Sequence, residues 1–153
     1  MTEAHSTDQP RVVVGVDGSP HSEQALRWAA FFAGTVSGRV EAVTAWQYPT
    51  AYGVAALPAN WDPSHDMGGI VRRSIEKVFG ENGPPVPIEI VVREGSAARV
   101  LLDASRGAHM LVVGSRGHGG FVGLLLGSVS ASVAEHAPCP VLIAHGDQAP
   151  PGS

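Results

Sequence analysis

Glycine is concentrated in one short segment of the chain, residues 114–128, which read GSRGHGGFVGLLLGS. Its spacing is Gly114, two residues, Gly117, nine residues, and then Gly127 followed by Ser128. A run of glycines costs conformational entropy on folding. The sequence must therefore gain something from it, and the candidates are a tight turn, a ligand bound close to the backbone, or flexibility alone.

The chemistry that such a loop can perform is the binding of phosphate. Gly119 and Gly120 let the backbone come close to a ligand. Ser128 is predicted to cap a helix, and a helix N-terminus carries unpaired N–H groups and a partial positive charge that attract phosphate. The hydroxyls of Ser128 and Ser130 can add hydrogen bonds, and Arg116 can supply a full positive charge.

Other nucleotide and catalytic motifs fit the sequence less well. A P-loop needs a lysine on the phosphates, and the only lysine of the chain, Lys77, is far from the loop. A dinucleotide fingerprint needs GxGxxG directly after the first strand, where this chain has GVDGS. No HxxxH pair or GxSxG motif is present. We interpret His118, beside the glycines, as an exposed loop histidine and not as a general acid or base.

Alternating strand and helix patterns predict the elements that must position this loop. Five runs rich in valine and isoleucine are typical of strands: 11–16, 39–46, 86–92, 109–115 and 140–145. Helical patterns lie between them, from Ser19–Pro20 to Gly34, over 66–79 to Gly80, from Ser96 to Gly107, and from Ser128 to Pro138. This order predicts an α/β fold with a doubly wound, five-stranded parallel sheet. Ligands in such sheets bind beyond the carboxyl ends of the strands, where GVDGS, AWQYP and the glycine loop should meet.

Length and composition bound the kind of protein. The 153 residues suit one domain, expected over 11–146, between polar or proline-rich tails at 1–10 and 147–153 that we expect to be disordered. A net charge of −4 without a basic block argues against nucleic acid as a partner. No apolar run reaches the roughly 18 residues of a membrane span. The polar start lacks a signal peptide and the single cysteine allows no internal disulfide, so we expect a cytoplasmic protein.

The loop spacing, together with VVVGVDGSPHSEQALRWAA and PCPVLIAH, resembles the universal stress protein family in its ATP-binding branch. The motif of that family, G-2x-G-9x-G-S/T, matches at Gly114, Gly117, Gly127 and Ser128, and the resemblance covers about residues 10–145. It implies a Rossmann-like sheet of the adenine nucleotide alpha hydrolase type, with strand order 3-2-1-4-5. One departure is Gly-Ser-Ala at 95–97, where the family often has Gly-x-Pro.

The same resemblance implies a set of ligand-binding residues. Gly15 and Val16 would line the adenosine, and Asp17 would lie near the ribose or a phosphate-bound Mg²⁺. The backbone around Trp46 would contact adenine, with its ring in packing. The loop and the helix after it would hold ribose and phosphates through Gly114, Ser115, Arg116, Gly117, His118, Gly119, Gly120, Gly127, Ser128, Val129 and Ser130.

Three functions from different classes remain open from the sequence. The first is a stress or signalling regulator that binds ATP with little or no turnover, as a homodimer paired through the last strand, 140–145. The second is a slow ATPase, although the loop lacks the lysine and the base that fast phosphoryl transfer needs. The third is a nucleotide-free interaction module or a cyclic AMP binder. The irregular segment 47–69 could fold over a nucleotide, and the protein partner is not indicated.

Overall fold

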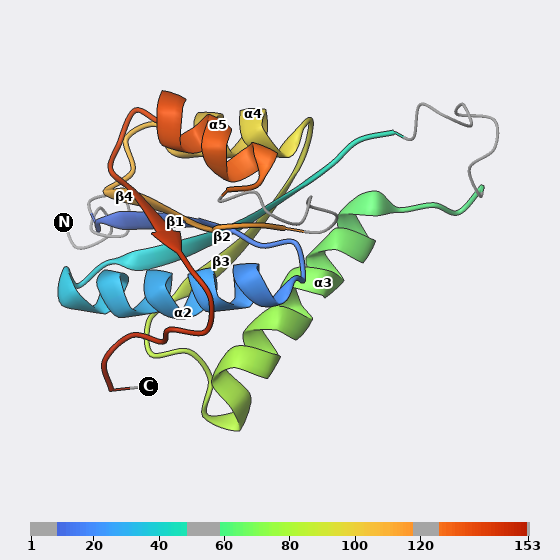
Figure 1. Cartoon of the computed structure of the whole chain (residues 1–153). Coiled ribbons are helices and arrows are strands. Elements are labelled where there is room, and N and C mark those ends of the chain that lie inside the picture. Colours follow the sequence, from blue (N-terminus) through green and yellow to red (C-terminus); the bar gives the residue numbers. More distant parts are fainter. Residues whose placement is uncertain (1–8, 49–58, 118–125, 153) are drawn as a thin grey trace, which may run out of the picture.

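The sheet has the topology that the sequence predicts. The computed structural model describes residues 9–48, 59–117 and 126–152. Five parallel strands lie in the order β3-β2-β1-β4-β5 (Figure 1). Their bounds are β1 (Arg11–Gly15), β2 (Arg39–Trp46), β3 (Ile88–Glu94), β4 (Met110–Gly114) and β5 (Val141–Ala144). β2 lies on one side of β1 and β4 on the other, so the direction in which successive strands are added reverses at β1. A cleft for a ligand is expected at this point, beyond the carboxyl ends of the strands.

Two helices cover each face of the sheet (Figure 1). One layer contains α2 (Pro20–Thr35) and α3 (Pro63–Phe79), which is followed by a short 3-10 turn, η3 (Gly80–Asn82). The other contains α4 (Ala97–Ala104) and α5 (Ser128–His136). No helix in the described ranges is long and apolar enough to cross a membrane.

Side-chain caps explain where three of the helices begin. The hydroxyl of Ser19 accepts a hydrogen bond from Ser22 N–H at 3.2 Å, and that of Ser96 accepts one from Arg99 N–H at 3.4 Å, as predicted. Helix α3 begins earlier than the predicted residue 66. The carboxylate of Asp62 accepts a hydrogen bond from His65 N–H at 3.2 Å, so the helix starts at Pro63.

The prediction that Ser128 caps the last helix is wrong by one residue. The carbonyl of Gly127 already accepts the first helical hydrogen bond, from Ala131 N–H at 3.0 Å. Gly127 is therefore the N-cap, it supplies no side-chain cap, and Ser128 is the first residue of α5. The first turn of α5 thus keeps N–H groups that no capping side chain satisfies.

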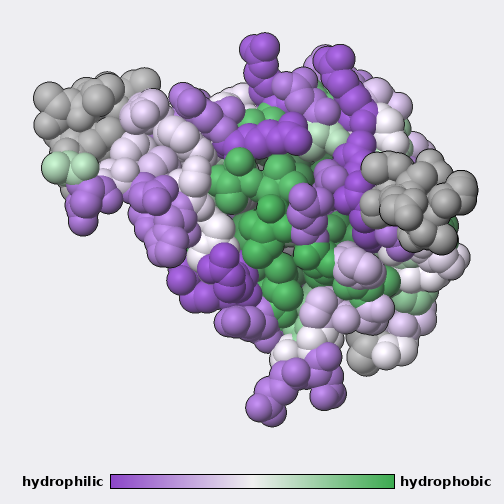
Figure 2. Space-filling view, turned by 180° about the vertical axis from the view of Figure 1, so that it is seen from behind, coloured by the Kyte–Doolittle hydropathy of each residue, from purple (hydrophilic) through white to green (hydrophobic). Residues whose placement is uncertain are grey.

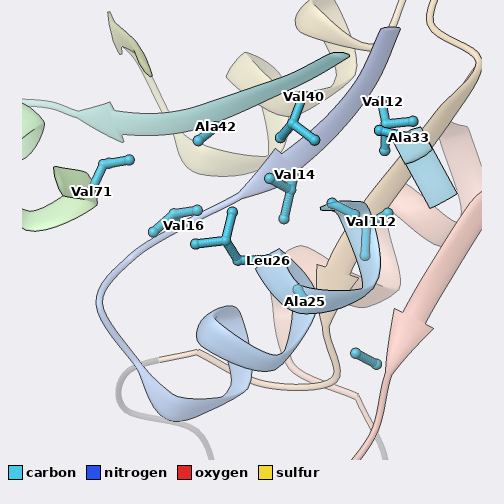
Figure 3. Packing of buried hydrophobic residues seen from close by; sticks show 12 residues of the cluster. Val12, Val14, Val16, Ala25, Leu26, Ala33, Val40, Ala42, Val71 and Val112 are labelled. Carbon is cyan, nitrogen blue, oxygen red and sulfur yellow. The ribbon is translucent and has the colours of Figure 1, made fainter. Parts of the chain in front are cut away.

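The core consists of two layers because side chains alternate along each strand. Val12, Val14 and Val16 pack with Leu26 of α2 and Val71 of α3 (Figure 3). The intervening Val13 packs on the other face, in a cluster that includes Val43, Val100, Leu111 and Val133. Burial on both faces explains why the strands read as nearly continuous apolar runs.

Two features lie at the edges of the fold. Along β3, an edge strand, Ile88, Ile90 and Val91 are only half-buried, and Figure 2 shows apolar side chains gathered on this side of the molecule between α3 and α4. After β5 the chain lies along α2, where Trp28 Nε1 donates to the Gln148 carbonyl at 3.0 Å. The sequence predicts a loose tail for this last segment.

Candidate functional site

A cavity of about 460 Å³ lies beyond the carboxyl ends of the central strands. The first turns of α3 reach this end of the sheet (Figure 1) and contribute Met67 and Ile70 to its wall. Its volume falls within the range of about 300–1,000 Å³ that small-molecule sites occupy. Most sequence-predicted site residues line it: Gly15, Val16, Asp17, Gly114, Arg116, Gly117, Gly127, Ser128, Val129 and Ser130.

A second hollow, of about 590 Å³, lies on the outer surface between α4 and α5. Its lining includes Arg99, Asp103, Arg106 and His136, and none of the sequence-predicted site residues. It touches none of the strand ends, and the helix start in its lining, at Ser96 of α4, already has its side-chain cap. We therefore assign the candidate site to the first cavity.

The part of the cavity formed after β4, here called the β4 side, is built on backbone. Gly127 N–H donates to the Ser115 carbonyl at 2.7 Å, and the Ser130 hydroxyl donates to the Gly114 carbonyl at 2.5 Å. These two bonds fix the start of α5 against the end of β4. The helix N-terminus, with its partial positive charge, is thereby directed at the cavity. Ser130 is buried, and its hydroxyl proton is used in the bond to Gly114, whereas Ser128 is exposed.

Gly117 permits a close approach between the β4 loop and the turn after β1. A Cβ placed on Gly117 would lie 2.5 Å from Oδ2 of Asp17. The other carboxylate oxygen of Asp17, Oδ1, accepts hydrogen bonds from Ser19 N–H at 2.9 Å and from the Ser19 hydroxyl at 2.5 Å. Asp17 is therefore held by the N-cap of α2 while its carboxylate faces the loop.

Gly114 has a different reason to be glycine. A Cβ at this position would lie 2.7 Å from the backbone carbon and oxygen of His21 in the first turn of α2. Backbone atoms cannot move aside as the end of a side chain can. Gly114 is thus required by the packing of β4 against α2, whether or not a ligand is bound.

The part of the cavity next to β2, here called the β2 side, contains an open strand edge at Ala45. The last hydrogen bond between the first two strands joins Val16 N–H to the Val43 carbonyl at 2.9 Å. The neighbouring residue Trp46 points its carbonyl the other way and accepts from Gly95 N–H at 2.8 Å. Because backbone direction alternates along a strand, the N–H and C=O of Ala45 face past the end of β1. Within the described ranges neither group has a backbone partner.

Ala45 takes the place at the cavity that the sequence assigns to Trp46. Ala45 lines the cavity and Trp46 does not. The Trp46 ring instead packs edge-to-face against Tyr48, with centroids 5.2 Å apart, and against Trp61, at 5.7 Å. The expectation that this ring serves packing is confirmed. The backbone that faces the cavity is that of Ala45, one residue before Trp46, because the direction of each N–H depends on register.

The remaining lining of the β2 side escaped sequence reasoning. It comes from β2, α3 and α4, which lie apart in the chain, and it is mostly apolar: Val43, Thr44, Met67, Ile70, Ala97, Val100 and Leu101. Val113 of β4 and Ser22 of α2 also line the cavity. The segment AWQYP pointed to this strand end. The segment 47–69, expected to fold over a nucleotide, contributes Met67 to the lining, while its residues 49–58 lie outside the described residues. Nothing in the sequence indicated that Ile70 and α4 would line the cavity as well.

Other predicted residues lie elsewhere or beyond description. Ser115 is buried, its N–H donates to the Ala144 carbonyl at 2.9 Å, and it does not line the cavity. His118, Gly119 and Gly120 lie outside the described residues. In the described ranges no group of three or more His, Cys, Asp or Glu side chains could hold a metal ion. Burial raises the pKa of the Cys139 thiol, which lies away from the cavity.

The fold and this cavity define an α/β protein whose candidate ligand site lies at the switch point of a doubly wound sheet. The model of the universal stress protein family matches residues 10–145, and the chain belongs to this family. It is 37% identical over 137 residues to universal stress protein Rv2623 of Mycobacterium tuberculosis, covering 89% of this chain and 45% of that relative. It is 34% identical over 151 residues to a universal stress protein of Mycolicibacterium smegmatis, covering 89% of this chain and 48% of that relative. The chain thus spans about half the length of these curated relatives.

Solved structures give the same picture of the fold. A universal stress protein crystallised in complex with cAMP superposes with a TM-score of 0.60 at 28% identity, covering 90% of this chain and 97% of that chain. A universal stress protein family protein from Arabidopsis thaliana with AMP bound superposes with a TM-score of 0.55 at 20% identity, covering 94% and 97%. The fold is shared with both.

Proposed function

We propose that this protein binds an adenine nucleotide, ATP by preference, in the cavity at the strand ends and acts as a nucleotide-dependent stress regulator with little or no turnover. The observation that carries the proposal is the convergence of an open strand edge at Ala45 and an uncapped helix N-terminus at Ser128 on one cavity. The family membership and the relative crystallised with cAMP support a ligand of the same class.

The β2 side of the cavity suits a purine. One donor and one acceptor of Ala45 face the same space, and adenine presents both an amino donor and ring-nitrogen acceptors on its edges. Around them the wall is apolar, from Met67 and Ile70 on one side and Leu101 on the other. Such a wall excludes water from the flat faces of the base, so the two backbone hydrogen bonds gain strength.

The β4 side suits the phosphates. The free N–H groups at the start of α5 attract an anion, and Arg116 adds a charged donor at the same wall. Mg²⁺ in nucleotide sites is usually held by phosphates with one or two carboxylates. Asp17 lines the cavity and fits that role, so a Mg²⁺ ion carried by the nucleotide would be held by its phosphates beside this carboxylate.

Little turnover is expected because the described wall lacks the usual phosphoryl-transfer machinery. Arg116 and a Mg²⁺ ion would neutralise phosphate charge, but fast transfer also needs an oriented nucleophile, and the sequence indicates neither a base for that role nor a phosphate-binding lysine in the loop. The chain's only lysine, Lys77, pairs with Glu23 at 3.4 Å and does not line the cavity.

Cyclic AMP is a second candidate ligand, favoured by the relative crystallised with it.

Assembly and partners belong to the same proposal. The strand β5 lies at a sheet edge, and an edge strand offers unpaired N–H and C=O groups. We propose that segment 140–145 pairs with a second copy to form a homodimer in the cytoplasm. Nucleotide binding would then change the surface offered to a protein partner by selecting one arrangement of the cavity loops.

The experiment is to identify the small molecules released from freshly purified protein by mass spectrometry, and then to titrate emptied protein with ATP, AMP and cyclic AMP by calorimetry. Co-purified ATP, or ATP binding tighter than that of the other two, supports the proposal. Steady phosphate release would favour a slow ATPase. An empty protein that binds none of the three at millimolar concentration would overturn it.

A further inference from the structure

The Thr44 side chain is a buried polar group for which the fold provides no partner. Its residue is only 4% exposed. No hydrogen bond joins its hydroxyl to any other part of the chain that the structure describes. A buried hydroxyl left without a hydrogen bond costs about 1–3 kcal/mol, so this position calls for an explanation.

The hydroxyl reaches the cavity. Among the described residues, the only buried side-chain nitrogen or oxygen that is closed off without a partner is Nε of Arg39. The Thr44 oxygen also lacks a partner, so it must keep contact with open space, and Thr44 borders the cavity. Strand alternation places its side chain on the same face as Ala42, which packs in the layer that includes Val71 of α3 (Figure 3).

Thr44 lies on the β2 side of the cavity. It immediately precedes Ala45, whose N–H and C=O form the open strand edge. Met67 and Ile70, from α3 on the same face of the sheet, supply apolar walls around it. The helix N-terminus at Ser128 lies on the β4 side, and β1 separates β2 from β4 in the sheet.

We propose that the Thr44 hydroxyl is a specificity-determining contact to the purine base, an inference that rests on the proposed function. A hydroxyl both donates and accepts, so it can satisfy an amino group or a ring nitrogen of the base. Together with Ala45 it gives the β2 side three polar groups in an otherwise apolar pocket. This is the usual arrangement by which a site fixes the orientation of a flat ligand.

The test compares wild-type protein with Thr44→Val, which keeps the branched shape and removes the hydroxyl. We expect Thr44→Val to weaken adenosine and ATP binding by the same factor, about five- to tenfold. The same factor is expected for 2′,3′-dideoxyadenosine, because the contact is to the base. The melting temperature of the ligand-free variant should change little, since the fold provides the Thr44 hydroxyl with no hydrogen-bond partner that the substitution would remove.

The matched control is Thr35→Val, at the exposed end of α2, where the hydroxyl donates to the Phe32 carbonyl at 2.7 Å and lies away from the cavity. It should leave all three affinities unchanged. Equal affinity of Thr44→Val and wild type would overturn the inference and leave the proposed function standing. A loss confined to adenosine and ATP, absent for the dideoxy compound, would mean a ribose contact and would also overturn it. Wild-type protein that binds none of the three would overturn both proposals.

Discussion

The two sides of the cavity are built in different ways. The β4 side comes from one continuous stretch of chain in which Gly117, Gly127 and Ser128 stand close together in sequence. The β2 side is assembled from β2, α3 and α4, and its polar groups are the backbone of Ala45 and the hydroxyl of Thr44. The β4 side therefore depends on glycine and a helix end, whereas the β2 side depends on the register of one strand.

That contrast predicts different losses when each side is altered. Changes on the β4 side should affect phosphorylated ligands more than adenosine. Changes on the β2 side should affect all adenine ligands equally. Calorimetric titration with adenosine and with ATP separates the two, because of these ligands only ATP carries phosphates.

The largest effect is expected from Gly117→Val. A Cβ at this position would already lie 2.5 Å from Asp17 Oδ2, and the two methyl groups of valine would fill the space beside it. ATP binding should fall at least about 100-fold, the loss of several charge-assisted hydrogen bonds. Calorimetry measures the affinity, and circular dichroism checks that the fold is retained.

The control for Gly117→Val is Gly127→Ala. Its added Cβ would lie 3.5 Å from the Arg116 Cα, an ordinary contact, so the backbone need not move. We expect less than about a threefold change in ATP affinity. If Gly127→Ala were as harmful as Gly117→Val, the close approach to Asp17 would not be the reason for the glycine.

A smaller loss, about 10- to 30-fold, is expected from Ala45→Pro, which removes the cavity-facing N–H. The ladder to β3 should survive because it uses the backbone of Thr44 and Trp46. Adenosine and ATP should weaken by the same factor, measured by calorimetry. A loss for ATP with none for adenosine would contradict the assignment of the base to Ala45.

A still smaller loss is expected from Arg116→Gln. Arg116 is half-buried at the cavity wall, so solvent screens part of its charge. ATP should bind about five- to tenfold more weakly, and the difference should shrink as salt is raised. Adenosine affinity should not change, and an equal loss for adenosine would place this arginine near the base.

The sequence was informative where local signals decide the structure. The positions of the strands and the caps at Ser19 and Ser96 follow from patterns within a few residues, and the structure confirms them. The order of the strands in the sheet was implied by the family resemblance, and the structure confirms that as well. The wall formed by Met67 and Leu101 depends on how α3 and α4 pack against the sheet, and no local sequence pattern predicts that packing.

The prediction named Trp46, whereas the backbone at the cavity is that of Ala45, and this difference has a related cause. A shift of one residue along a strand reverses the direction of its N–H and C=O. The sequence located the strand end correctly, but only the pairing with β1 fixes which residue faces the cavity. The N-cap of α5 is likewise one residue away from the predicted Ser128, because the Gly127 carbonyl accepts the first helical hydrogen bond.

The most direct test of the account is a crystal structure of this protein grown with millimolar ATP. We predict the purine on the β2 side, hydrogen-bonded to the backbone N–H and C=O of Ala45, and the phosphates at the start of α5. A cavity that holds only solvent under those conditions, or a nucleotide bound with its phosphates beside β2, would contradict it.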